Sequence, residues 1–206
     1  MLAPEKLTLV AITDDLRGDA ADLLARALAA ARGGATMIQL RLKDADARTL
    51  VEVGRALVAA LPRDVPLIVN DRADVAIAAG AAGVHVGAVD VPPAALRRVV
   101  PTEFIIGASV GTDAEVAFAA EADYVGIGPV YATDSKHDAG TAIGTEGLAD
   151  LVVRAKRPAV AIGGIDATNA AAAVVAGATG VAAIRAIFGA RDPEQAARAI
   201  RSAIGR

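Results

Sequence analysis

Short apolar runs alternate with longer, alanine-rich segments along the whole chain. Most of the runs are apolar throughout rather than at every second position, which is typical of parallel strands that are covered on both faces. We therefore predict eight strands, at Leu7–Ile12, Thr36–Leu40, Leu67–Asn70, Gly83–Val86, Phe104–Gly107, Tyr124–Gly128, Ala159–Ile162 and Val181–Ile184.

The segments between these runs have the length and composition of helices. Examples are Asp19–Arg32, Asp46–Leu61, Thr112–Glu121 and Thr145–Lys156. Eight strands, each followed by a helix, close naturally into a (β/α)₈ barrel, so we predict an α/β fold in which residues 1–206 form a single TIM barrel domain. An open, doubly wound sheet is the alternative, because periodicity alone does not reveal whether a sheet closes.

Three joints between a helix and the following strand have similar sequences, which favours the barrel. They are 33–37, 79–84 and 176–181, and 120–124 stands where a fourth copy would fall. Glycine at the end of a helix supplies a left-handed cap. Because the joints precede the second, fourth, sixth and eighth strands, the repeating unit would be a pair of βα modules. Recurrence through composition alone is the alternative.

Composition narrows the classes of function. The 206-residue chain has 21 basic and 24 acidic residues, a formal net charge of −3, and 2% aromatic residues, so we expect no nucleic-acid partner. It has no cysteine, which excludes disulfides and thiolate chemistry. The amino terminus lacks the layout of a signal peptide, and the uncharged stretch 167–184 is interrupted by Asn169, Gly177 and Gly180. We expect a cytoplasmic protein with no membrane partner.

Two cations and an amide lie at alternate positions where the second strand ends. Gln39, Arg41 and Lys43 are two residues apart, so their side chains point the same way. In a barrel this is the functional end of the strand. Convergent cations suit a polyanion such as a phosphorylated compound. A solvated strand end without function is the alternative.

Two carboxylates, Asp71 and Asp90, follow the third and fourth strands. Mg²⁺ is usually held by one or two carboxylates together with oxygens of a phosphorylated substrate. Two carboxylates next to a cationic cluster therefore indicate a magnesium site. Capping of the following helix is the alternative for each aspartate, since Pro92 is a favourable residue for a first helical turn.

A loop of 16 residues, 129–144, follows the sixth strand. Connections of about 2–6 residues are usual here, and longer ones mostly serve function. Thr133, Ser135 and Lys136 offer two hydroxyls and a cation, a set that fits phosphate oxygens. A flexible insertion is the alternative, but the loop lacks the glycine and serine content of one.

Gly163 and Gly164 precede the seventh helix, and Arg185 follows the eighth strand. The loops after strands seven and eight are a frequent phosphate site in barrels of this kind, because glycines let backbone N–H groups approach the phosphate. We interpret His85, which is flanked by valines within a strand, as a packed and hydrogen-bonded residue. The chain shows no spacing typical of nucleophilic hydrolysis.

Six segments, in this order, resemble the thiamine-phosphate synthase family over nearly the whole chain. They are QLRLK at 39–43, IVNDR at 68–72, GVHVG at 83–87 with Asp90 after it, GAS at 107–109, DYVGIGPVYATDSK at 123–136 and AIGGI at 161–165. The resemblance implies a (β/α)₈ enzyme that joins aminomethylpyrimidine diphosphate to a thiazole phosphate and releases pyrophosphate.

The resemblance also implies roles for individual residues. The pyrimidine diphosphate would be held by Gln39, Arg41, Lys43, Asn70, Ser109 and Lys136. The cofactor Mg²⁺ would be bound by Asp71 and Asp90. The thiazole phosphate would be held by Thr133, Ser135, Gly164 and Ile184. The catalytic candidates among these are Arg41, Lys43, Ser109 and Lys136.

That chemistry suits the residues. An amino-substituted pyrimidine stabilises a benzylic-type cation, so the diphosphate can leave before the thiazole nitrogen attacks. Catalysis then requires charge stabilisation and alignment of two small-molecule substrates, and no general base.

The chain departs from the family pattern at two positions. It has Ala88 where the family usually has glutamine, and Arg185 where it usually has serine; we expect Arg185 to bind the thiazole phosphate. A thiazole tautomerase and a non-catalytic phospholigand-binding regulator are alternatives on the same barrel. The retained Asp71, Asp90 and cations favour the synthase. A homo-oligomer is left open.

Overall fold

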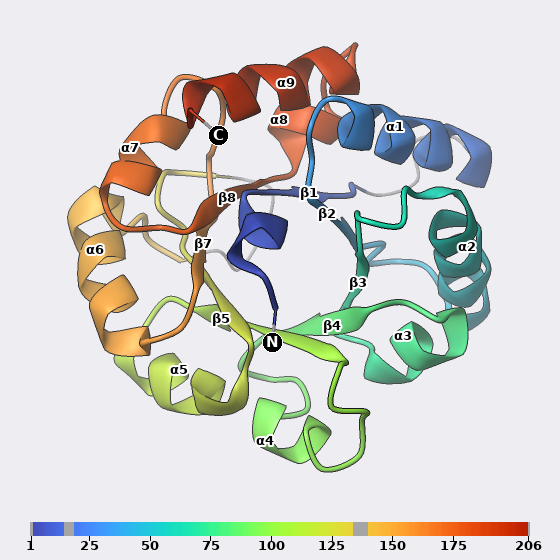
Figure 1. The fold of residues 1–206 in the computed structure, drawn as a ribbon. Coiled ribbons are helices and arrows are strands. Elements are labelled where there is room, and N and C mark those ends of the chain that lie inside the picture. Colours follow the sequence, from blue (N-terminus) through green and yellow to red (C-terminus); the bar gives the residue numbers. More distant parts are fainter. Residues whose placement is uncertain (1, 15–18, 134–139, 206) are drawn as a thin grey trace.

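In a computed structural model, which describes residues 2–14, 19–133 and 140–205, eight parallel strands close into a barrel in chain order (Figure 1). The last strand pairs with the first, in the register Val10↔Ala182. The (β/α)₈ prediction is therefore confirmed, and the open sheet is wrong. The strands are β1 (Leu9–Ile12), β2 (Met37–Leu40), β3 (Leu67–Asn70), β4 (Gly83–Val86), β5 (Ile105–Val110), β6 (Tyr124–Ile127), β7 (Ala159–Ala161) and β8 (Gly180–Ala183).

Helices form a ring around the barrel (Figure 1). They are α1 (Ala20–Arg32), α2 (Ala47–Ala60), α3 (Ala73–Ala79), α4 (Pro93–Leu96), α5 (Asp113–Phe118), α6 (Gly144–Ala155), α7 (Ala170–Val175), α8 (Arg185–Phe188) and α9 (Pro193–Ala203). Two 3₁₀ helices, Pro4–Leu7 and Ala119–Glu121, complete the described elements. None of the helices in this part of the chain has both the length and the apolar character needed to cross a membrane.

The predicted helix starts at Asp19 and Asp46 are one residue early, because both aspartates are caps. Their side chains accept hydrogen bonds from the backbone N–H groups of Asp22 and Thr49, three residues on. A capping side chain satisfies one of the donors that a helix start leaves unpaired.

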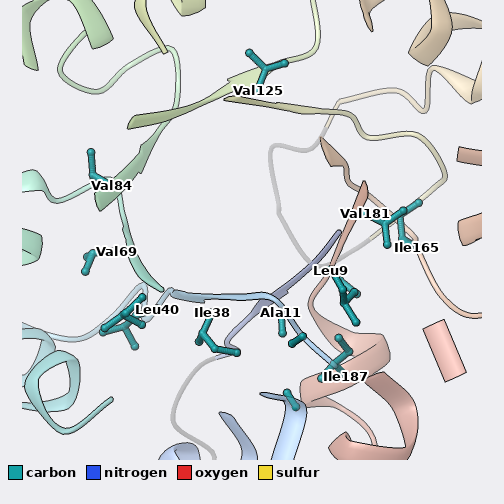
Figure 2. Packing of buried hydrophobic residues seen from close by; sticks show 14 of the residues in the cluster. Leu9, Ala11, Ile38, Leu40, Val69, Val84, Val125, Ile165, Val181 and Ile187 are labelled. Atoms are coloured by element: carbon teal, nitrogen blue, oxygen red, sulfur yellow. The ribbon is translucent and has the colours of Figure 1, made fainter. Parts of the chain in front are cut away.

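Each strand buries both of its faces, which explains why the apolar runs are continuous. Leu9 and Ala11 belong to the large cluster between the strands and the helices, whereas Val10 and Ile12 belong to a smaller cluster inside the barrel. Figure 2 shows Val69, Val84 and Val125, among others, in the outer cluster. The barrel interior is thus filled by packed side chains, as is usual in such barrels.

Glycine conformation confirms the repeated joints. Gly34, Gly80 and Gly177 have φ values of 103°, 72° and 104°. These lie in the left-handed region that side chains with a Cβ avoid. The fourth joint has no glycine, and the 3₁₀ helix Ala119–Glu121 leads into it instead.

The two ends of the barrel differ. Pro4–Leu7 forms a 3₁₀ helix where a strand was predicted to begin, and the side chain of Leu7 is fully buried in the interior cluster. In Figure 1 this amino-terminal segment, in blue, crosses the middle of the barrel. At the other end β5 runs to Val110, three residues beyond its predicted end, so Ser109 lies within the strand and not after it.

Candidate active site

The carboxyl ends of the strands open into a cavity of about 1050 Å³. Every strand contributes at least one lining residue. The cavity brings together the predicted site residues that are described, namely Gln39, Arg41, Lys43, Asn70, Asp71, Asp90, Ser109, Thr133, Gly164, Ile184 and Arg185. Ser135 and Lys136 lie outside the described residues.

Thr13 fixes the backbone that carries Arg41. Its buried hydroxyl donates to the carbonyl of Arg41 at 3.0 Å and accepts from the Arg41 N–H at 2.8 Å. The backbone N–H of Thr13 also donates to the carbonyl of Gln39 at 2.9 Å. These bonds continue the pairing of β1 with β2 beyond the last strand residue, and so hold the Arg41 side chain at the cavity.

The guanidinium of Arg41 is buried without complete hydrogen bonding. The residue is 8% exposed, and its Nη2 has no hydrogen-bond partner among the described residues. A buried charge that lacks a partner is destabilising, and a bound anion would relieve that cost. Lys43, two residues on, is exposed at the rim of the same cavity.

Two amides line the cavity beside Arg41. Gln39 is 4% exposed, and its Nε2 donates to Oδ1 of Asn70, on the next strand, at 2.8 Å. Because each amide has a donor end and an acceptor end, this bond fixes the orientation of both side chains. The cavity wall thus offers oriented polar groups for a heterocycle.

Neither Asp71 nor Asp90 caps a helix, so that alternative is wrong for both. The N-cap residues of α3 and α4 are Arg72 and Pro92. Asp71 has a left-handed φ of 63°, and its N–H donates to the His85 carbonyl at 2.7 Å. Asp90 closes the turn after β4, where its Oδ2 accepts from the Gly87 N–H at 2.7 Å.

These two carboxylates are a suitable but incomplete set of ligands for a hard divalent cation. The described part of the chain has no group of three or more histidines, cysteines or acidic residues that could hold a metal. The bond from Gly87 occupies one oxygen of Asp90, and a carboxylate has about four lone-pair sites. Mg²⁺ fits such a pair when substrate oxygens and water complete its coordination.

The opposite side of the cavity is built from backbone. Gly163 and Gly164 have φ values of 97° and 64°. A Cβ on Gly163 would lie 2.5 Å from Pro129 Cα, and one on Gly164 would lie 2.7 Å from the carbonyl oxygen of Ala132. Both positions therefore require glycine for conformation and for space.

Hydrogen bonds hold this glycine loop in place. The Gly163 carbonyl accepts from the Tyr131 N–H at 3.0 Å, and the Gly164 carbonyl accepts from Nδ2 of Asn169 at 2.8 Å. Oδ1 of Asp166 accepts from the hydroxyl and the N–H of Thr168, which lowers the pKa of that carboxyl. Asn169 was missed by the sequence analysis, and its spacing from Gly164 gives no recognisable signal.

Ile184 and Arg185 complete this side. Ile184 is the N-cap residue of α8, and its carbonyl accepts from the Phe188 N–H at 2.8 Å. Arg185 is the first residue of α8, and its exposed side chain lies at the rim of the cavity.

His85 lies deeper in the cavity, where it is partly buried and forms hydrogen bonds with two of the described residues. Its Nδ1 is 3.0 Å from the hydroxyl of Tyr124, and its Nε2 is 3.1 Å from Oγ of Ser109. The prediction of a packed, hydrogen-bonded histidine is confirmed. Tyr124 was not predicted to take part.

The fold and the cavity define a class: a (β/α)₈ barrel with a buried arginine, a carboxylate pair and a glycine loop at the carboxyl ends of its strands. Comparison with known proteins identifies the family within this class. The family model "Thiamine monophosphate synthase" matches residues 9–187. The chain belongs to the thiamine-phosphate synthase family.

Individual relatives agree. The chain is 48% identical over 207 residues to the thiamine-phosphate synthase of Xanthobacter autotrophicus strain Py2, covering 99% of this chain and 98% of the relative. It is 51% identical over 180 residues to that of Roseiflexus sp. strain RS-1, covering 85% and 76%. Its structure is similar to thiamine phosphate pyrophosphorylase from Pyrococcus furiosus, with a TM-score of 0.87, 38% identity and coverage of 98% and 97%.

Proposed function

We propose that the protein is a transferase that makes thiamine phosphate. It joins 4-amino-2-methyl-5-hydroxymethylpyrimidine diphosphate to a thiazole phosphate and releases pyrophosphate. The observation that carries this proposal, beside membership of the family, is the buried guanidinium of Arg41, whose Nη2 lacks a hydrogen-bond partner in the described part of the chain. A diphosphate supplies the charge and the acceptor oxygens that this group needs.

The reaction exchanges one bond for another. The C–O bond between the pyrimidine methylene group and the diphosphate breaks, and both of its electrons leave with pyrophosphate. The lone pair of the thiazole nitrogen then forms the new C–N bond. Neither step requires a protein base, because the amino-substituted ring stabilises the cation formed between them.

In this proposal, residues of different chemical type have different roles. Arg41, Lys43 and Lys136 stabilise the negative charge that develops on the leaving group. The pyrimidine is oriented by Gln39, Asn70 and Ser109. The thiazole phosphate is held by Thr133, Ser135, Gly164, Ile184 and Arg185. Alignment of the two substrates in one cavity replaces a chance encounter and contributes to the rate.

We further propose that Mg²⁺ is the cofactor and that Asp71 and Asp90 hold it. The ion would neutralise charge on the diphosphate. The fit rests on two hard oxygen ligands in one cavity, next to the cationic cluster. We also propose that the enzyme works in the cytoplasm on small molecules, without nucleic acid or membrane as a partner, in line with its net charge of −3.

Incubation with both substrates and Mg²⁺ tests the reaction directly. We expect pyrophosphate and thiamine phosphate to appear in equal amounts, and neither to appear when either substrate is left out. A tautomerase would instead isomerise the thiazole carboxylate phosphate and leave the pyrimidine diphosphate intact. Binding of both compounds without any conversion would identify a regulator and contradict the proposal.

A further inference from the structure

A chain of hydrogen bonds crosses three strands in the deeper part of the cavity wall. It runs from the Tyr124 hydroxyl on β6 to the His85 ring on β4, and from there to Oγ of Ser109 on β5. The register places His85, Gly107 and Tyr124 in one layer of the barrel, with Ser109 one layer nearer to the carboxyl ends. All three side chains line the cavity, and the chain leads from Tyr124, which is 2% exposed, to Ser109, nearer to the carboxyl ends of the strands.

Two glycines make room for the two rings. A Cβ on Gly107 would lie 2.3 Å from Cζ of Tyr124 and 2.5 Å from Nδ1 of His85. A Cβ on Gly126 would lie 3.1 Å from Cε1 of His85. The histidine ring thus occupies a space that the backbones of β5 and β6 leave for it, and this space determines which atom each ring nitrogen meets.

The hydroxyl of Tyr124 determines which nitrogen of His85 carries the proton. Burial, assisted by the nearby Asp123 carboxylate, raises the pKa of Tyr124 above its ordinary value of 10.0, so the hydroxyl keeps its proton at neutral pH. A buried O–H requires an acceptor, and its partner among the described residues is Nδ1 of His85. Nδ1 then accepts, and the ring proton of the neutral imidazole is on Nε2.

The tautomer of His85 determines how the Ser109 hydroxyl can form hydrogen bonds. Nε2–H donates to Oγ of Ser109, and a serine hydroxyl has one donor and two acceptor sites. With one acceptor site used by His85, the O–H of Ser109 can donate to another group in the cavity. In the opposite tautomer Ser109 would donate to His85 and would offer the cavity only lone pairs.

We propose that Tyr124 and His85 are positioning residues that make Ser109 a hydrogen-bond donor toward the substrate. They hold His85 as the Nε2–H tautomer, and the Ser109 hydroxyl then binds an acceptor atom of the pyrimidine diphosphate, either a ring nitrogen or a phosphate oxygen. The identity of the ligand rests on the proposed function. The tautomer of His85 does not.

Nitrogen NMR tests the tautomer without any substrate. The chain has two histidines, so a ¹⁵N-histidine-labelled H137Q variant reports His85 alone. We expect the pattern of a neutral imidazole protonated at Nε2, and loss of this single form in Y124F. The matched control is Y131F, which removes the other tyrosine hydroxyl, a donor to the Asn169 carbonyl at 3.4 Å. A proton on Nδ1 in the H137Q protein, or an unchanged spectrum in Y124F, overturns the proposal.

Steady-state kinetics test the action through Ser109. We expect Y124F to lower kcat/KM for the pyrimidine diphosphate by roughly five- to tenfold, the ratio that corresponds to one hydrogen bond. The KM for the thiazole phosphate should not change. H85Q, whose amide nitrogen can replace Nε2 as a donor, should keep more activity than H85N, whose shorter side chain cannot.

A double-mutant cycle separates positioning from a general structural effect. Y124F should have no further effect in an S109A background, because the group it acts through is gone. A full additional loss in S109A/Y124F contradicts the proposal. Thermal unfolding of each variant shows whether it is folded. If the wild type made no pyrophosphate, the proposed function would fail, while the NMR result would still decide the tautomer.

Discussion

The two sides of the cavity are built from different parts of the chain's chemistry, one mainly from side chains and the other mainly from backbone. The side built from β2 to β5 presents side chains, among them a buried guanidinium, two amides and two carboxylates. The side built from β6 to β8 presents backbone, through the left-handed pair Gly163 and Gly164 and the turn at Ile184. On the first side, the charges are carried by side chains and not by the backbone. On the second side, the backbone atoms that form the loop also form the wall of the cavity.

This difference predicts where substitutions do harm. On the side-chain side, a substitution should change activity more than stability. On the backbone side, even one added methyl group should reduce stability. The following experiments are ordered by the size of the expected effect.

The largest effect is expected for Arg41→Met. We expect kcat/KM for the pyrimidine diphosphate to fall by about 10²–10³-fold, the loss typical of removing one charge-stabilising donor. Stability should be unchanged or slightly higher, because a buried charge without a partner is removed. Arg63→Met, in the exposed joint between α2 and β3, is the control. A large loss of stability in R41M would contradict the division between the two sides.

Gly163→Ala tests the backbone side. A methyl group there meets Pro129 Cα at 2.5 Å and forces alanine to a φ of 97°, so we expect unfolding to be easier by about 3 kcal/mol or more. Gly80→Ala is the matched control, since Gly80 has a φ of 72° and open space around it, and it should lose only about 1–2 kcal/mol. Equal losses in urea unfolding would show that space is not limiting at Gly163.

Asp71→Asn and Asp90→Asn test the proposed metal site. An amide is a poorer ligand for a hard cation, so each variant should need at least about tenfold more Mg²⁺ for half-maximal activity. Asp74→Asn is the control, because Asp74 pairs with Arg72 at 2.6 Å and does not line the cavity. An unchanged Mg²⁺ requirement in both variants would rule out the carboxylate pair as the site.

Arg185→Ser restores the residue that is usual in the family. Because the side chain is exposed and screened by solvent, the KM for the thiazole phosphate should rise by only about two- to fivefold. The KM for the pyrimidine diphosphate should stay the same. A lower KM for the thiazole phosphate would mean that Arg185 crowds the site.

The smallest effect is expected for Asp166→Asn, and it should depend on pH. Hydrogen bonds from Thr168 lower the pKa of Asp166 in the folded protein below its ordinary value of 3.8. The stabilisation is therefore complete above about pH 4 and is lost as pH falls through the lower, folded value. The wild type should exceed D166N by less than about 1 kcal/mol at pH 7 in urea unfolding, and the gap should close in acid. A gap that widened in acid would reverse the assigned sign.

The sequence predicts the side-chain half of the cavity better than the backbone half. Residues such as Arg41 and Asp71 reveal themselves by charge at a strand end, and the cavity contains them. The role of Thr13 cannot be recognised in this way, because it depends on hydrogen bonds to Arg41, 28 residues further along the chain. α4 and α8 have four residues each, too short for any periodicity to predict.

The end of β5 shows a second limit. The strand was predicted to end at Gly107, but β5 continues to Val110. Glycine is required at position 107, within β5, because a larger residue would collide with Tyr124 and His85. The reason is a contact between strands, which a linear pattern does not contain.

The 3₁₀ helix at the amino terminus has a kinetic consequence. Leu7 is buried in the barrel interior and closes the amino-terminal ends of the strands. Among the described residues, ligands can therefore enter through the cavity at the carboxyl ends of the strands. Two substrates and two products must then share one route. Closing one end of the barrel thus confines substrate entry and product release to the same opening.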